Sequence, residues 1–131
     1  MVDKLIGTWM SVSSENFNTF LDAAGASQAL KAVAIKKSTV TISREDGGWK
    51  LVRTVGDNTI QMVYPLGQEV EITSFSGKKM KAALIEEPGR LIETIHMDFG
   101  KATVVLSADN NELLTEIFFK DSFATVTWQR V

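Results

Sequence analysis

The stretch that decides the fold is Leu5–Gly25, which reads L-I-G-T-W-M-S-V-S-S-E-N-F-N-T-F-L-D-A-A-G. Its short apolar segment around Gly7–Trp9 predicts a strand. Four apolar residues then recur at helical spacing and share one helical face: Phe17, Phe20, Leu21 and Ala24. Ser13 or Ser14 is expected to cap this helix, and Gly25 is expected to end it.

A second short helix is predicted from about Ser27 to Ile35, and the pattern then changes from helical to alternating. Tight-turn residues such as Asp46-Gly47-Gly48 separate the alternating segments. About ten strands are expected in all, and regular short strands indicate an antiparallel sandwich or barrel. Those after the helices are Ser38–Ser43, Trp49–Val55, Ile60–Tyr64, Glu69–Thr73, Lys79–Ile85, Leu91–Met97, Ala102–Leu106, Leu113–Phe119 and Ala124–Arg130.

The composition narrows the class of protein. A chain of 131 residues predicts one domain, covering residues 1–131. The net charge of -2 argues against a nucleic-acid partner. With no cysteine and a single histidine, His96, we expect no disulfide, no metal site and no cofactor. No signal-like or membrane-spanning run is found, so we expect a cytoplasmic protein. We also expect a monomer.

Five fragments, taken in order, resemble the intracellular lipid-binding proteins, a family of fatty-acid-binding proteins and cellular retinoid-binding relatives. They are G-T-W at Gly7–Trp9, S-E-N-F at Ser14–Phe17, the glycine at Gly25, L-G-Q-E at Leu66–Glu69 and S-G-K-K-M-K at Ser76–Lys81. The resemblance implies a ten-stranded antiparallel up-and-down β-barrel with a two-helix lid between its first and second strands. It also implies an internal cavity for one apolar ligand, and a carrier rather than an enzyme.

The chain departs from the family at the ligand's head group. Members that hold a fatty acid by its carboxylate use buried arginines on the eighth strand and in an R-x-Y motif on the last. Those positions are Leu106, Val126 and Trp128 here, so the usual carboxylate clamp is missing. A buried carboxylate without a partner costs several kcal/mol, whereas each buried methylene returns only about 0.8 kcal/mol. Arg53 and Arg130 remain possible charge partners. The side of Arg53 is open because a one-residue offset in the alternation enters before Leu66, and Arg130 shares the parity of Val126 and Trp128 but lies at the terminus.

Two kinds of ligand therefore stay open. The first is a neutral lipid, such as an alcohol, ester, amide, sterol or isoprenoid. The second is a fatty acid that enters tail-first and leaves its head at the portal, near three lysines that are also candidates for contact with anionic membranes: Lys31, Lys36 and Lys37.

The expected ligand contacts are mostly apolar. They are Phe17, Leu21, Leu30, Ala34, Val40, Met62, Ile72, Phe75, Ile95, Val104, Leu106, Thr115, Ile117, Val126 and Trp128. Glu93 is expected to point inward by alternation from Ile95, toward ordered water or the ligand. Trp9 and Trp49 are expected to be structural, and His96 exposed.

The sequence therefore predicts a cytoplasmic carrier of one long-chain hydrophobic molecule. An interaction module with a reduced cavity, which engages a membrane or a protein, is the main alternative. An enzyme that uses Thr115 and Glu93 on a bound lipid is the third hypothesis, and the sequence shows no catalytic motif in its support.

Overall fold

The structure is a computed structural model that describes residues 2–16, 38–55, 58–73, 79–97, 100–109, 111–119 and 122–131. The helices predicted between residues 17 and 35 lie outside the described residues. None of the helical structure in the described part of the chain has the length and apolar content of a membrane span.

The described chain forms one short 3-10 helix, η1 (Val2–Leu5), and a ten-stranded sheet. The strands are β1 (Gly7–Glu15), β2 (Ser38–Glu45), β3 (Gly48–Val55), β4 (Asn58–Pro65), β5 (Val70–Thr73), β6 (Lys79–Glu87), β7 (Arg90–Met97), β8 (Gly100–Asp109), β9 (Glu112–Phe119) and β10 (Ser122–Arg130). Their alternating apolar residues place one face of the sheet in the core.

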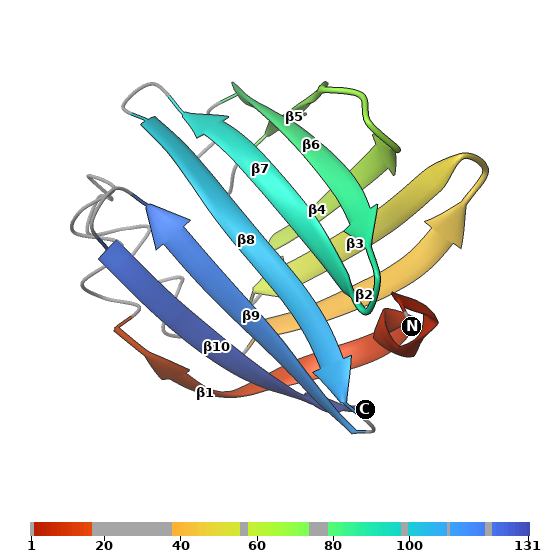
Figure 1. Ribbon diagram of the computed structural model, residues 1–131. Coiled ribbons are helices and arrows are strands. Elements are labelled where there is room, and N and C mark those ends of the chain that lie inside the picture. Colours follow the sequence, from red (N-terminus) through yellow and green to blue (C-terminus); the bar gives the residue numbers. More distant parts are fainter. Residues whose placement is uncertain are drawn as a thin grey trace.

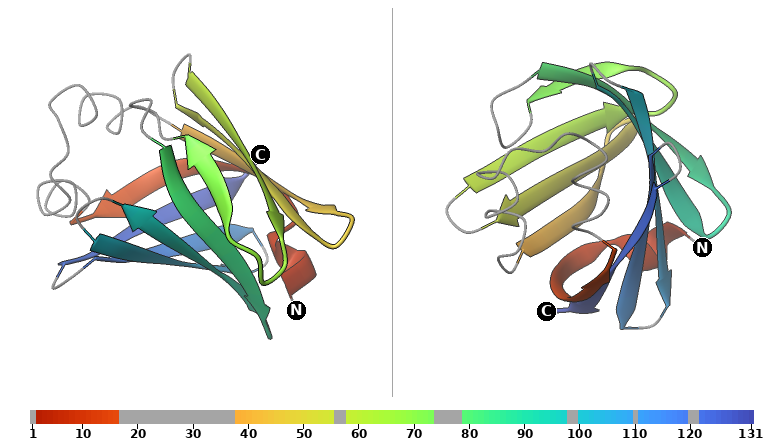
Figure 2. Two further views of the ribbon diagram at one scale, coloured as in Figure 1. Left: turned by 90° about the horizontal axis from the view of Figure 1, so that it is seen from above. Right: turned by 90° about the vertical axis from the view of Figure 1, so that its left-hand side faces the viewer.

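The sheet wraps into a nearly closed antiparallel barrel (Figure 1). Its strand order is β4-β3-β2-β1-β10-β9-β8-β7-β6-β5, so the first and last strands of the chain pair with each other. β4 and β5 end the order and come into contact on the same side of the barrel (Figure 2). The connection between them is tied to β6, because the Gly67 amide donates to the Leu84 carbonyl over 3.4 Å. The predicted ten-stranded barrel is confirmed.

One predicted boundary is wrong. Ser13 and Ser14 do not cap a helix, because β1 continues through both to Glu15 and pairs with Thr127 and Val126 of β10. The register shifts between Ser11 and Ser13, as at a β-bulge. The long β10 strand supplies the partner groups that a local sequence pattern does not reveal.

Trp9 lies in the core, as expected of a structural residue. Its side chain is fully buried, and its indole N–H donates to the Leu5 carbonyl over 3.0 Å. The Arg130 guanidinium stacks over the indole at 4.1 Å and donates to the carbonyls of Ile6 and Lys4. Arg130 is therefore held by the N-terminal segment and does not serve as an interior charge partner.

Trp49 is likewise fully buried and structural. Its indole N–H donates to Glu86 Oε1 over 3.0 Å, and Arg44 stacks on its ring at 4.3 Å. Arg44 also donates to Glu86 over 3.2 Å. These contacts join the β2–β3 hairpin to the β6–β7 hairpin.

Because β3 approaches β4 closely, we expect an alanine substitution to cost more stability at Gly48 than at Gly47. A Cβ on Gly48 would lie 1.9 Å from the Tyr64 carbonyl oxygen, whereas one on Gly47 meets nothing within 4 Å. Gly48→Ala should lower the free energy of unfolding by about 3 kcal/mol, because backbone must move. Gly47→Ala is the control and should cost about 1–2 kcal/mol, because its φ is 75°. Urea unfolding followed by tryptophan fluorescence measures both, and equal losses would contradict the packing at Gly48.

Candidate functional site

The register of the strands places the predicted ligand contacts on one face of the sheet. Residues directly opposite each other in an antiparallel ladder point to the same side. Leu106 and Thr115 form one such pair, and Thr115 and Val126 form another. Ten predicted contacts share this inward face: Val40, Met62, Ile72, Ile95, Val104, Leu106, Thr115, Ile117, Val126 and Trp128. The others lie outside the described residues: Phe17, Leu21, Leu30, Ala34 and Phe75, together with Lys31, Lys36 and Lys37.

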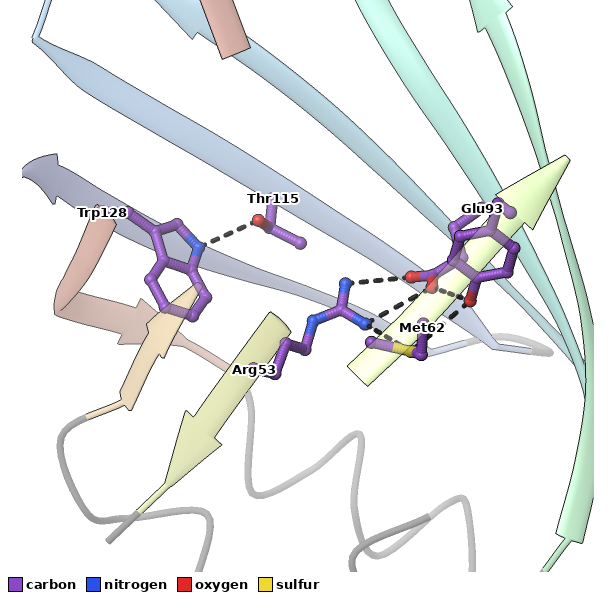
Figure 3. A network of polar contacts seen from close by, with 6 residues as sticks. Arg53, Met62, Glu93, Thr115 and Trp128 are labelled. Carbon is purple, nitrogen blue, oxygen red and sulfur yellow. Dashed lines mark hydrogen bonds and ion pairs between the residues drawn. The ribbon is translucent and has the colours of Figure 1, made fainter. Parts of the chain in front are cut away.

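Three polar side chains meet inside the barrel, from strands β3, β4 and β7. Arg53 holds both oxygens of Glu93, with Nη2 3.0 Å from Oε1 and Nη1 3.3 Å from Oε2. The Tyr64 hydroxyl also donates to Oε2. Because β3 and β7 are not neighbours in the sheet, the ion pair spans the interior (Figure 3).

A methionine completes the contacts around the guanidinium. Met62 Sδ lies 3.6 Å from Arg53 Nη1 and 3.5 Å from the Tyr64 hydroxyl. A second polar pair lies on another part of the inward face, where the Trp128 indole N–H donates to Thr115 Oγ1 over 2.9 Å (Figure 3). Trp128 and Thr115 are both buried.

The interior therefore holds more polar groups than Thr115 and Glu93, the two that the sequence predicts there, because Arg53 and Tyr64 also point inward. Arg53 pairs with Val40 on one side and with Ile60 on the other, which fixes its side chain on the inward face. Alternation predicted correctly that Glu93 points inward. Its partners within the protein are Arg53 and Tyr64.

The ion pair offsets the cost of burying Glu93. The Glu93 side chain has no exposed surface, and an isolated carboxylate in that position costs several kcal/mol. Burial raises the pKa of Tyr64 well above its ordinary value, and the nearby Glu93 charge raises it further. Burial alone would lower the pKa of Arg53, but the Glu93 charge and hydrogen bonds outweigh it and raise that pKa. Arg53 is thus a cation and Tyr64 a neutral donor at neutral pH.

Arg53 nevertheless keeps 22% of its side-chain surface accessible, although it points into the barrel. Part of the Arg53 side chain is therefore not covered by protein atoms. A polar group of a bound molecule is able to approach it there. Within the described ranges, no group of three or more histidine, cysteine, aspartate or glutamate side chains is placed to hold a metal ion.

An up-and-down barrel with an apolar inward face and a small internal polar site defines a lipid-binding β-barrel. Comparison with models of protein families finds no match. The chain is 32% identical to mouse "Fatty acid-binding protein 12" over 133 aligned positions, which cover 100% of both chains. It is 34% identical to human "Fatty acid-binding protein 9" over 80% of each chain. The chain belongs to the fatty-acid-binding protein family, within the intracellular lipid-binding proteins.

The solved structures agree on the fold. A fatty acid binding protein of Schistosoma mansoni, solved in complex with arachidonic acid, superposes with a TM-score of 0.93 at 17% identity. The match covers 99% of this chain and 98% of that one. The family resemblance drawn from the five sequence fragments is confirmed.

The environment of Tyr64 predicts its behaviour at alkaline pH. Because its pKa is raised in the folded protein, its contribution to stability is complete below pH 10.0, the ordinary pKa of tyrosine. That contribution declines as pH rises above this value, because only the unfolded chain then ionises. The chain has one tyrosine, so tyrosinate absorbance reports Tyr64 alone and should appear only with unfolding. Ionisation near pH 10 in the folded protein would contradict the buried contact with Glu93.

Proposed function

We propose that this protein is a cytoplasmic, monomeric carrier that binds one long-chain hydrophobic molecule inside the barrel. The observation that carries the proposal is the inward face itself. Ile95, Ile117 and Val126 face the interior but are only partly buried, while they pack against the buried core. Apolar side chains that face inward without being fully covered are what an apolar guest needs.

The names of the relatives support a lipid as the bound ligand. The curated relatives are fatty-acid-binding proteins, and the Schistosoma structure contains arachidonic acid. Each buried methylene contributes about 0.8 kcal/mol, so a long tail supplies most of the binding free energy. Lost ligand freedom offsets part of this gain, and we expect reversible binding that suits delivery.

The carrier has no catalytic step in this proposal. Glu93 and Thr115, the residues that a lipid-modifying enzyme would need, are engaged in other contacts. Glu93 accepts hydrogen bonds from Arg53 and Tyr64, and Thr115 accepts one from Trp128. A general base must reach its substrate's proton, and these partners occupy the groups that would do so.

The position of the head group remains part of the proposal. Leu106, Val126 and Trp128 stand where relatives carry a carboxylate clamp, so a fatty acid would leave its head at the portal near Lys31, Lys36 and Lys37. The same lysines are proposed to contact anionic membranes during ligand transfer, in a weak and salt-sensitive way.

A bulky substitution on the inward face tests the carrier function directly. Val126→Trp should fill space that the ligand needs and lower affinity for an environment-sensitive dye such as ANS by at least about tenfold. Thr127→Trp is the matched control, because the next residue along β10 points outward and should leave affinity unchanged. Mass spectrometry of organic extracts should find lipid with the wild-type protein and less with Val126→Trp. A wild-type protein that carries no lipid and binds no dye would instead favour the interaction module with a reduced cavity.

A further inference from the structure

The guanidinium of Arg53 has hydrogen-bonding capacity that its contacts with the described residues do not use. An arginine carries five N–H donors in a plane. Within the described part of the chain, its contacts engage two Nη1 donors, toward Glu93 and Met62, and one Nη2 donor, toward Glu93. The Nε–H and the second Nη2–H remain, and they lie together on one edge of the guanidinium.

This free edge faces the interior of the barrel. Arg53 lies on the inward face between Val40 and Ile60, and 22% of its side chain is accessible. Two parallel donors at such a place fit an oxygen acceptor at the end of a bound chain. The surrounding inward face is apolar, so the remainder of the guest meets hydrocarbon.

The charge of the site decides which acceptor fits. Glu93 already balances the charge of Arg53 and is fully buried, with its two oxygens held by Arg53 and Tyr64. A ligand carboxylate at the free edge would add a second anion to a neutral pair in a weakly screened interior. It would also lose its hydration without a cation of its own. An amide, alcohol or ester oxygen accepts the same hydrogen bonds and carries no charge to desolvate.

We infer that the Arg53–Glu93 pair is a head-group site for an uncharged lipid whose terminal oxygen accepts hydrogen bonds from Arg53, and that Glu93 disfavours carboxylates there. This inference rests on the proposed carrier function and adds the chemical class of the ligand. Arg53 is the binding residue, and Glu93 sets the specificity because it neutralises the cation before the ligand arrives.

Three ligands with the same hydrocarbon chain test the site: oleamide, oleyl alcohol and oleate. Their affinities are measured for the delipidated full chain by displacement of a fluorescent probe. Glu93→Gln keeps the size of the side chain and leaves Arg53 as an unbalanced cation. It should strengthen oleate binding by at least about tenfold and change oleamide binding by less than about threefold.

Arg53→Met provides the second variant. It should weaken binding of oleamide and oleyl alcohol by about tenfold, because the donors to their oxygen are lost. Thr54→Met is the matched control on the outward side of β3, and it should leave all three affinities unchanged. Arg53→Met tests the site even where Glu93→Gln does not fold.

The outcomes separate the two proposals. If none of the three ligands binds the folded wild-type protein, the carrier function is wrong. If they bind, but Arg53→Met leaves oleamide unaffected, the head-group site is wrong and the carrier function stands. Oleate binding that is tighter than oleamide binding in the wild-type protein and is lost with Arg53→Met would also overturn the inference, because Arg53 would then be a carboxylate partner.

Discussion

The ion pair between Arg53 and Glu93 is the constraint on which the chemistry of this barrel depends. It joins β3 to β7 through the interior rather than through the sheet, and Tyr64 on β4 completes it. A buried ion pair is a poor source of stability, since desolvation cancels much of the attraction. Its effect here is on specificity, because it determines the charge that a guest meets inside an otherwise apolar enclosure.

The surrounding structure accommodates this pair. Trp9 and Trp49 are fully buried, and their indole N–H groups donate to the Leu5 carbonyl and to Glu86. Tyr64 lies opposite Trp49 in the ladder between β3 and β4, so the residue whose hydroxyl reaches Glu93 is paired with a packed aromatic residue. The polar site is thus supported by packed aromatic residues, which limit its freedom to rearrange.

The positions of charge differ from those that the family resemblance implies. The family resemblance implies that the clamp arginines of the eighth and last strands would fall at Leu106 and Val126 of this chain, and Trp128 satisfies its indole N–H with Thr115. A guanidinium is present instead on β3, together with its own carboxylate. The interior cation of this barrel is thus the guanidinium of Arg53, which is already balanced by Glu93.

The sequence predicted the barrel well because strand alternation and tight turns are local signals. It also placed Glu93 inward, since Ile95 two residues later shares its face. It did not show which face of the sheet carries Arg53, because a one-residue offset in the alternating pattern before Leu66 would move Arg53 to the opposite face. Nor could it pair Arg53 with Glu93, since forty residues separate them in the chain. The false helix cap at Ser13 or Ser14 has the same cause, because the strand partner is the distant β10.

A double-mutant cycle on the folded protein tests the interior ion pair most directly. The free energies of unfolding of Arg53→Met, Glu93→Gln and the double variant are compared with that of the wild-type protein. An ion pair that spans the interior predicts a coupling free energy of about 2 kcal/mol or more, since each single variant leaves a buried partner unsatisfied. Additive losses, with no coupling between the two positions, would show that Arg53 and Glu93 do not meet inside the barrel.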